Sequence, residues 1–376
     1  MKVALDYRPA LFSRSGIARA VRELSRALAS QASDISLHLF GHGLHAARLT
    51  EVPQDARLHR SRLPGRSLPL WKALGLDASR LAGRSQIFHW TDYVYPPVNE
   101  ETLVVQTVHD LAFLEDPRFH GVEQSRILAR RFAKALDRAD CIVCPSESTS
   151  QDLRRHFPDR APIHVIPFGV DHVQRHRADP DAGRQLARHY LGTARPYLLC
   201  LGTLEPRKNH RTLLEAWESL PTPRMPLLFV GASGWSDVRL QQDLRRGGQD
   251  LAWTGEICDA DVFDLMAGSR ALAYPSSLEG FGFPPMEALE LGIPPVVGDC
   301  RALRELLGEA ALHADGTDPR QLAEAIQRID RDDALRSRIL KSWQIRRSGL
   351  TWQICAERHI GIYRDLLGQG RYRRSG

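Results

Sequence analysis

Residues 197–202 read Tyr197-Leu198-Leu199-Cys200-Leu201-Gly202, a short apolar run that ends in glycine. A continuous apolar run of this length is typical of a strand buried on both faces, as in a parallel sheet that helices cover. Polar residues follow as far as Asn209, and a helical pattern then covers Arg211–Leu220. A strand, a loop and a helix in this order form the repeating unit of an α/β fold.

The same alternation runs on both sides of this stretch, with a pause around Pro180–Ala194. Upstream, a helix is predicted at Gly16–Ala29 and strands at Lys2–Tyr7, Ile35–Phe40, Phe88–Thr91, Leu103–Val108, Cys141–Cys144 and Ile163–Ile166. Downstream, strands are predicted at Leu227–Val230, Ala271–Tyr274 and Pro295–Val297, and helices at Asp261–Ala267, Pro284–Leu291 and Leu322–Ile329. We predict two doubly wound, Rossmann-like parallel-sheet domains, residues 1–175 and 176–350, that face each other across a cleft. A ligand is expected there, at the carboxyl ends of the strands.

Length and composition agree with two folded domains. The chain has 376 residues, of which 43% are hydrophobic and 26% charged. No apolar run is long enough to span a membrane, and the start Met1–Asp6 is unlike a signal peptide, so a cytoplasmic location is expected. The net charge of +6 favours an anionic partner: a nucleotide, an anionic lipid surface or nucleic acid. Cys141 and Cys144 form C-x-x-C within a predicted strand; we interpret them as core thiols, because no second pair completes a metal site.

One segment, Arg57–Arg84, has an unusual composition. Basic residues far outnumber Asp77, its only acid, and leucines with Trp71 lie between them. Such a mixture suits a segment that lies on anionic lipid at the cytoplasmic face of the inner membrane. It suits equally well a solvated loop and helix with an apolar underside.

The richest motif is Pro275–Leu289, which follows a predicted strand and enters a helix. Its glycines allow close approach of backbone to a ligand, and the amides at the helix start face that ligand. Glu279 precedes the turn and Glu287 is expected in the first helical turn, so both carboxylates can face one pocket and accept hydrogen bonds from sugar hydroxyls. Helix-dipole stabilisation explains Glu287 alone, but not the whole combination.

A second motif, Gly202–Asn209, carries the adjacent cations Arg207 and Lys208 before a helix that Asn209 or a neighbour is expected to cap. Two cations are unfavourable at the positive end of a helix dipole, so an anion such as a diphosphate is expected there; solvated surface charge is the alternative.

Weaker candidates follow the strands of the first domain. Gly16 opens the first helix with Arg19 one turn later, in a segment that lacks the dinucleotide fingerprint G-x-G-x-x-G. His109 and Asp110 end the fourth predicted strand on the cleft side, where a histidine is either a ligand contact or structural.

Together these motifs resemble the retaining glycosyltransferases of family 4, which have the two-domain GT-B fold, over essentially the whole chain. Glu279 and Glu287 have the spacing of the family's E-x7-E, and Arg207-Lys208-Asn209 and Gly231…Gly234-Trp235 accompany it. The combination is similar to bacterial mannosyltransferase-type enzymes that build O-antigen, lipopolysaccharide or exopolysaccharide.

The resemblance implies roles for the individual residues. Arg207 and Lys208 would neutralise the leaving diphosphate, and Glu287 would bind the ribose. Glu279 and the backbone of Gly280, Phe281, Gly282 and Phe283 would hold the donor sugar. His109 would face that sugar, while Gly16 would lie near the phosphates and the acceptor, together with Arg19 and Asp110. Thr203 stands where many relatives carry arginine, so one phosphate contact is missing or supplied elsewhere.

The resemblance also implies partners. The expected reaction moves mannose or D-rhamnose from a GDP-sugar to a lipid-linked or growing cell-surface glycan; a UDP- or dTDP-sugar would use much the same residues. No cofactor or metal is expected, and Asp259-Ala260-Asp261 is interpreted as a helix cap. Residues 351–376 would form a helix that crosses back to the first domain, and a loose basic tail. A non-catalytic nucleotide-sugar or glycan-binding protein is the less favoured class, and nucleic acid is not an expected partner.

Overall fold

The computed structural model describes residues 1–31, 34–44, 52–116, 119, 121–158, 160–235 and 238–374. The chain divides into two compact units. Unit 1 comprises Met1–Gly169 with Leu350–Gly376, and unit 2 comprises Val170–Gly349. Among the described residues, no helix has the length and apolar character needed to cross a membrane.

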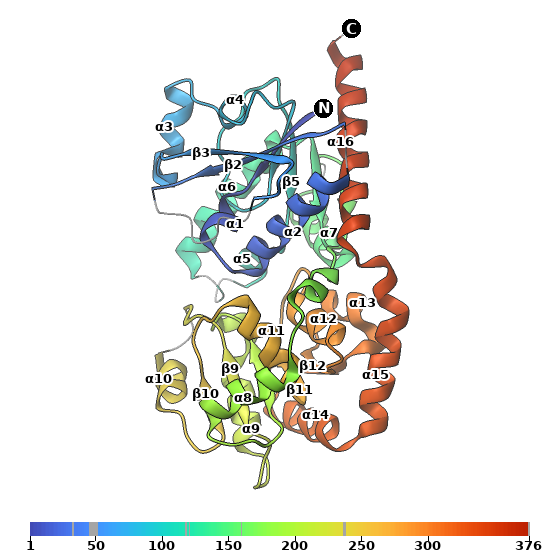
Figure 1. The fold of residues 1–376 in the computed structure, drawn as a ribbon. Helices are drawn as coiled ribbons and strands as arrows, with labels where there is room; N and C mark the ends of the chain where they lie inside the picture. Colours follow the sequence, from blue (N-terminus) through green and yellow to red (C-terminus); the bar gives the residue numbers. More distant parts are fainter. Residues whose placement is uncertain are drawn as a thin grey trace. The chain divides into compact units, whose positions relative to one another are not determined.

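Unit 1 is built on a seven-stranded parallel sheet in the order β3-β2-β1-β4-β5-β6-β7 (Figure 1). Its strands are β1 (Lys2–Asp6), β2 (Ser36–His42), β3 (Ala56–Ser61), β4 (Ile87–Trp90), β5 (Leu103–Thr107), β6 (Cys141–Cys144) and β7 (Ile163–Val165). Its helices are α1 (Arg8–Phe12), α2 (Gly16–Gln31), η1 (Gly65–Ser67), α3 (Leu68–Ala73), α4 (Ala78–Leu81), α5 (Ala112–Glu115), α6 (Val122–Arg138), α7 (Glu147–His156) and α16 (Trp352–Arg374).

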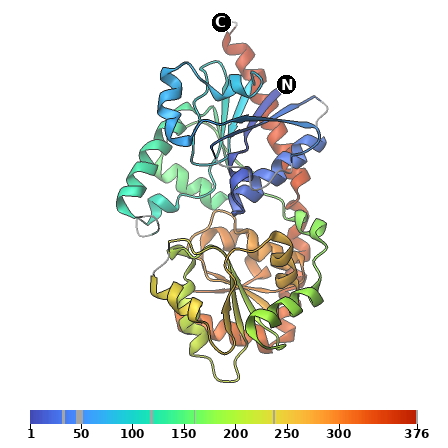
Figure 2. The same cartoon turned by 60° about the vertical axis from the view of Figure 1, so that its left-hand side comes forward.

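Unit 2 repeats the plan with a six-stranded parallel sheet in the order β10-β9-β8-β11-β12-β13, around which its helices lie (Figure 2). Its strands are β8 (Leu198–Leu201), β9 (Leu227–Val230), β10 (Leu251–Trp253), β11 (Ala271–Tyr274), β12 (Pro295–Gly298) and β13 (Leu312–Ala314). Its helices are η3 (Asp171–His176), α8 (Pro180–Leu191), η4 (Pro206–Lys208), α9 (His210–Glu218), α10 (Val238–Arg246), α11 (Asp259–Gly268), α12 (Phe283–Glu290), α13 (Arg301–Leu307), η5 (Gly308–Ala310), α14 (Pro319–Arg331), α15 (Asp333–Arg346) and η6 (Arg347–Gly349). The predicted fold class is confirmed.

Each sheet reverses its strand order at one place, between β1 and β4 in unit 1 and between β8 and β11 in unit 2. At such a switch point the loops after the two strands leave toward opposite faces of the sheet, which opens a crevice at the carboxyl ends. The two switch points are therefore the positions at which to look for ligand-binding side chains.

Three strands and several helices, among them α6, α8 and α15, were not predicted by residue range. The strands β3, β10 and β13 all lie at sheet edges, where one side lacks a strand neighbour and the apolar pattern weakens. Because β3 precedes β4, His109 follows the fifth strand and not the fourth. The helix α8 occupies the stretch interpreted as a pause; Asp179 caps its start, Pro180 is its first residue, and Gly192 ends it in the left-handed region.

The segment Arg57–Arg84 agrees in part with the interpretation as a loop and helix with an apolar underside, although it begins as a strand. Its first residues form the edge strand β3, and Trp71 on α3 is buried, with its ring edge against Phe40 at a centroid distance of 6.4 Å. The apolar residues that were expected to face lipid are thus divided. Trp71 belongs to the core of unit 1, whereas Leu70 and Leu74 stay largely exposed.

The C-terminal helix α16 belongs to unit 1, where it packs beside α2 (Figure 2). Two buried histidines hold it to the sheet. His89 on β4 shares hydrogen bonds with the Tyr363 hydroxyl and the Thr107 hydroxyl, both at 2.7 Å, and stacks on His359. His359 Nδ1 donates to the Cys355 carbonyl at 2.8 Å. Both rings are fully buried.

This contact predicts a loss of stability in acid. Burial lowers the pKa of His359 to about 4, although its hydrogen bond to Cys355 raises it. Burial, and then the nearby His359, lower the pKa of His89 well below its usual value. Above pH 6.5 both imidazoles are neutral whether the chain is folded or unfolded, so their contribution is complete. As the pH falls from 6.5 toward 4, the unfolded chain binds protons before the folded chain does. For His359 alone, this lowers the free energy of unfolding by about 3 kcal/mol.

Unfolding by urea at pH 7.0 and pH 4.5 tests this expectation. His359→Asn should flatten the dependence of the unfolding free energy on pH, whereas the control His189→Asn, at an exposed end of α8, should leave it as in the wild type. Equal slopes for His359→Asn and the wild type would contradict the assignment.

Candidate active site

The predicted motifs of unit 2 meet at its switch point. The loop Gly202–Asn209 follows β8, and the loop Pro275–Gly282 follows β11, its neighbour in the sheet. Main-chain and side-chain bonds join the two loops: Ser277 N donates to the Arg207 carbonyl at 2.9 Å, and Asn209 Nδ2 donates to the Pro275 carbonyl at 2.8 Å and to Ser277 Oγ at 2.6 Å. Asn209 stands at the start of α9 as predicted, but its side chain joins the loops and does not cap the helix.

Arg207 lies between two carboxylates. Its Nε is 2.9 Å from Glu205 Oε2, and its Nη1 is 2.7 Å from Glu279 Oε1. Nη1 also donates to the Leu278 carbonyl at 2.8 Å. All three charged side chains are largely buried. The guanidinium thus fixes the β11 loop, and its charge is already balanced before any ligand binds.

Glu279 is the buried partner in this arrangement. It accepts a hydrogen bond of 2.7 Å from the Tyr274 hydroxyl, in addition to its pair with Arg207. Burial would raise the pKa of Glu279, but Arg207 and Lys208 together hold it below its usual range. Burial and the Glu279 charge raise the pKa of Tyr274 well above its usual range. Glu279 is therefore an ionised acceptor, and Tyr274 a neutral donor, at neutral pH.

Lys208 differs from Arg207. Its ammonium lies 5.4 Å from the centre of the Tyr274 ring and close to Gly202, where a Cβ atom would come within 2.6 Å of Nζ. Within the described part of the chain, no carboxylate lies in ion-pairing distance of Lys208. Burial, then Lys208 and Arg207, lower the pKa of the neighbouring His210 to about 3, which agrees with a positive potential at the start of α9. Lys208 is thus the cation that a ligand phosphate can meet.

Glu287 lies deeper than predicted. The helix α12 begins at Phe283, so Glu287 stands in its second turn and not its first, because the two prolines occupy the opening turn. Its carboxylate is fully buried, and its Oε1 lies 2.9 Å from His172 Nε2 on η3. The pair ties α12 to the start of unit 2.

The glycine-containing turn between the two glutamates presents backbone. Phe281 and Phe283 are buried, with ring centres 4.9 Å apart, and Gly280 is buried as well. Gly282 has φ of 84°, and a Cβ there would meet Leu303 Cδ2. Thr203, half-buried on the β8 loop, approaches Gly234 of the next loop. Asp259 and Asp261 lie in the first turn of α11, but Cys258 is the residue that caps it, which corrects the predicted cap.

The remaining candidates belong to unit 1. Gly16 is exposed at the start of α2, and Arg19 is buried one turn later. His109 is buried; its Nε2 donates to the Thr91 carbonyl at 2.8 Å, which leaves Nδ1 as the acceptor. Burial lowers the pKa of His109 against the opposing effect of Thr91. The Asp110 carboxylate accepts a hydrogen bond from Ala112 N, and the Asp110 carbonyl accepts one from the Tyr93 hydroxyl.

Two site residues had no recognisable signature in the sequence. Tyr274 appears there only as the last apolar residue of a strand, and His172 lies 115 residues from its partner Glu287.

The predicted cysteines Cys141 and Cys144 are buried on β6, and burial raises the pKa of Cys141 to about 12.

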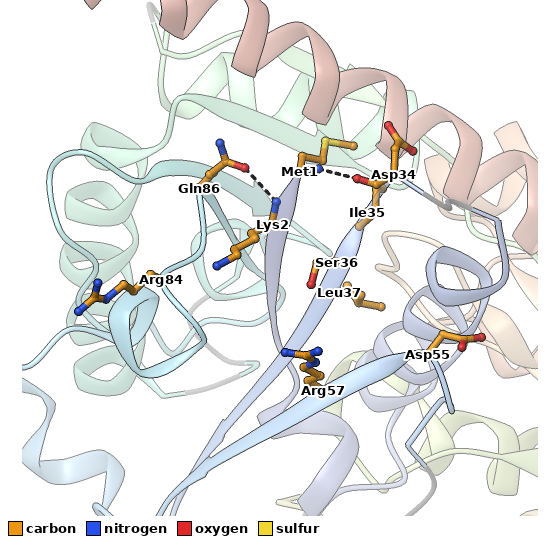
Figure 3. Close-up of a pocket in the computed structure, with 10 residues that line it drawn as sticks. All are labelled: Met1, Lys2, Asp34, Ile35, Ser36, Leu37, Asp55, Arg57, Arg84 and Gln86. Atoms are coloured by element: carbon orange, nitrogen blue, oxygen red, sulfur yellow. Dashed lines mark hydrogen bonds between the residues drawn. The ribbon is translucent and has the colours of Figure 1, made fainter.

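A hollow of about 750 Å³ lies elsewhere in unit 1, at the amino-terminal ends of β1, β2 and β3 (Figure 3). Lys2 N donates to Gln86 Oε1 at 2.9 Å there, and the chain amino group donates to the Asp34 carbonyl. These bonds hold the strand starts together. The hollow is at the opposite end of the strands from the switch point, so we assign it no part in catalysis.

Comparison with known proteins follows the same division of the chain. Residues 14–174 match the family model described as Glycosyltransferase Family 4, and residues 184–343 match the model described as Glycosyl transferases group 1. The O-antigen chain mannosyltransferase B of Escherichia coli is 29% identical, over 97% of this chain and 100% of its own length. A GDP-mannose-dependent alpha-(1-6)-phosphatidylinositol monomannoside mannosyltransferase of Mycobacterium tuberculosis is 28% identical, over 71% of this chain and 80% of its own.

Among solved structures, a sucrose-phosphate synthase from Thermosynechococcus elongatus superposes with a TM-score of 0.78 at 21% identity, over 98% of this chain and 100% of its own. This likeness concerns the fold.

Proposed function

This chain belongs to the family 4 glycosyltransferases, enzymes of the polysaccharide-biosynthesis type with the GT-B fold, and we propose that it transfers a hexose from a GDP-sugar to a glycan with retention of the anomeric configuration. Mannose or D-rhamnose is the proposed sugar. The acceptor is a lipid-linked or growing cell-surface glycan.

The observation that carries the proposal is the different state of the two adjacent cations. Arg207 is paired with Glu205 and Glu279, whereas Lys208 has no ion-pair partner among the described residues and can meet a ligand at the same switch point. In sugar transfer from a nucleoside diphosphate, negative charge develops on the leaving diphosphate. A fixed cation at that place stabilises the transition state more than the ground state. We therefore propose that Lys208 receives the diphosphate while Arg207 holds Glu279 in place beside it.

The other roles follow from the same arrangement. Glu279, ionised and oriented by Tyr274, would accept hydrogen bonds from the donor-sugar hydroxyls, together with the backbone of the turn that ends at Phe283. Glu287, oriented by His172, would accept from the ribose. The roles of Gly16 and Thr203 near the donor phosphates, and of His109, neutral at pH 7, beside the transferred sugar, are proposed from the family resemblance alone. No metal is needed in this scheme, because Lys208 and the amides of the loops bear the phosphate charge.

The donor base is proposed from the relatives. The printed name of the mycobacterial relative specifies GDP-mannose, and that of the E. coli relative specifies mannosyl transfer to O-antigen. UDP- and dTDP-sugars present the same diphosphate to Lys208, so they are the alternatives that an experiment must separate.

The direct test is a panel of GDP-, UDP- and dTDP-sugars assayed by mass spectrometry, with and without EDTA. We expect nucleoside diphosphate release with GDP-mannose or GDP-rhamnose at a rate that EDTA leaves unchanged. An α-linked product from an α-linked donor, identified by proton NMR, would support retention. Turnover with UDP-sugars alone would contradict the GDP proposal, and a β-linked product would contradict retention.

A peripheral contact with anionic lipid, on the cytoplasmic face of the inner membrane, is proposed for part of Arg57–Arg84. Leu70 and Leu74, one helical turn apart, are 62% and 70% exposed, and Arg80 is exposed nearby in the sequence. We expect Leu70→Glu with Leu74→Glu to lower partition onto phosphatidylglycerol vesicles by about tenfold, because two apolar side chains become acidic.

Ile345→Glu is the matched control, since Ile345 is also exposed but lies on α15. Partition that is unchanged in the double variant, or reduced equally in the control, would rule out this contact surface.

A further inference from the structure

The switch point of unit 1 carries a polar cluster that the proposed donor site does not use. It consists of Asp6 at the end of β1, Arg8 at the start of α1, His42 at the end of β2 and Asp92 just after β4. The strands β1 and β4 are the two between which the strand order reverses, as β8 and β11 are in unit 2. The cluster therefore has the same place in its sheet as Lys208 and Glu279 have in theirs.

The cluster has two layers. Arg8 Nη2 forms an ion pair with Asp92 Oδ2, and these side chains are 22% and 18% exposed. Asp6 and His42 are buried behind them. Asp6 Oδ1 accepts a hydrogen bond of 3.1 Å from the Arg8 backbone amide, and Asp92 Oδ1 accepts one of 2.7 Å from Tyr93 N. The partly exposed pair can touch a ligand, and Asp6 in the buried layer holds the Arg8 backbone in position.

Several polar atoms of the cluster have no protein partner. Among the described residues, nothing forms a hydrogen bond with Asp6 Oδ2, Arg8 Nε or either ring nitrogen of His42. Buried polar atoms are nearly always bonded in folded proteins, because leaving them without a partner is unfavourable. Four such atoms beside the ends of the neighbouring strands β1 and β2 indicate a site whose hydrogen bonds are completed by something other than the folded chain.

The chemistry of the cluster selects a neutral ligand that is rich in hydroxyl groups. Its carboxylates accept, its guanidinium donates and its imidazole can do either, as a sugar hydroxyl also can. The Arg8 charge is balanced by Asp92, and a second carboxyl lies behind it, so a phosphate would find no excess of positive charge. Burial raises the pKa of Asp6 to about 7, with Arg8 lowering it and Asp92 raising it. Near neutral pH that carboxyl can therefore donate as well as accept.

We propose that Arg8 and Asp92 bind the terminal neutral sugar of the acceptor glycan, and that Asp6 is the positioning residue behind Arg8. This inference rests on the proposed function, since a transferase needs a second, polyhydroxylated substrate beside its donor. The side chains that select the acceptor then follow β1 and β4, the two strands of the switch point.

Measurement of the acceptor KM tests the partly exposed pair, Arg8 and Asp92. Asp92→Asn keeps the shape of the side chain but removes the charge that fixes Arg8. It should raise the acceptor KM by about tenfold, the effect of a lost hydrogen bond to a charged group. The donor KM should change much less than the acceptor KM, so the ratio of the two KM values is the readout. Asp55→Asn is the control, because Asp55 is an exposed aspartate just before β3, at the opposite end of the same sheet from the cluster. An acceptor KM equal to that of the wild type in folded Asp92→Asn would overturn the proposal.

The positioning role of Asp6 has its own test. Asp6→Asn retains an oxygen for the Arg8 amide, whereas Asp6→Ala removes it. We expect the alanine variant to raise the acceptor KM with little change in kcat, and the asparagine variant to restore most of the loss. A fall in kcat with unchanged acceptor KM in both variants would contradict positioning.

A binding measurement without donor separates this inference from the proposed function. Saturation-transfer NMR with the methyl α-glycosides of mannose, rhamnose, glucose and N-acetylglucosamine, and with mannose 6-phosphate, needs no turnover. We expect at least one neutral glycoside to bind the wild type, more weakly to Asp92→Asn, and better than the phosphate. Binding of the phosphate alone, or of no glycoside, would refute the subsite even if donor hydrolysis is observed. Glycoside binding without any donor turnover would instead refute the proposed reaction.

Discussion

Lys208→Ala is expected to lower kcat by about a hundredfold to a thousandfold, the loss that follows removal of one group aimed at developing charge in an enzyme site. The ammonium lies over Tyr274 and against Gly202, away from the carboxylates that balance Arg207. No other described cation is placed to replace it on the β8 loop, because Arg207 is committed to Glu205 and Glu279. Initial rates of donor hydrolysis and of transfer measure the effect.

Two companion variants make the result specific. Lys208→Arg keeps a cation and should recover part of the rate, and Lys341→Ala, on the exposed surface of α15, should behave as the wild type. A folded Lys208→Ala protein with a kcat within about twofold of the wild type, well short of the loss expected for such a group, would remove the assigned role of this residue.

Gly183→Ala is expected to destabilise unit 2 by about 3 kcal/mol, at the upper end of what overpacking one methyl group causes. Gly183 lies within α8, and a Cβ there would overlap the carbonyl oxygen of Asp264 on α11. The obstacle is backbone, so the two helices must move apart. Thermal unfolding should show the transition of unit 2 lowered by about 10 °C.

Gly361→Ala is the matched control, since Gly361 lies within α16 and its Cβ position is open. Alanine there should leave stability unchanged or raise it by about 0.5–1 kcal/mol through the better helix propensity. Equal effects of the two substitutions would mean that α8 and α11 do not approach as closely as described.

The fold could be predicted from the central strands and not from the edges. Strands such as β8 and β11 are buried on both faces, so their sequences are continuous apolar runs. The edge strands β3 and β10 lack that pattern. The buried face of the helix α8 carries the small residues Gly183 and Ala187 and only one large apolar residue, Leu191, so its apolar pattern is weak.

The site could be predicted in part. Arg207, Lys208 and Glu279 were found because chain-local chemistry singled them out: two cations at a helix start, and a carboxylate in a glycine-containing turn. The sequence could not show that Arg207 is ion-paired and Lys208 is not. The pairing of Arg207 depends on Glu279, which lies more than seventy positions later in the chain but comes within 2.7 Å in the fold. The pairing of Glu287 with His172 is likewise a product of the fold.

The central claim is that the switch point of unit 2 holds a nucleoside diphosphate through Lys208. Isothermal titration of the wild type and Lys208→Ala with GDP and with GMP, in EDTA, tests it most directly. We predict that the wild type binds one GDP per chain about tenfold or more tightly than GMP, because only the second phosphate reaches the ammonium. In Lys208→Ala that preference should disappear. Equal affinities of the wild type for GDP and GMP, or a preference that survives in Lys208→Ala, would contradict the claim.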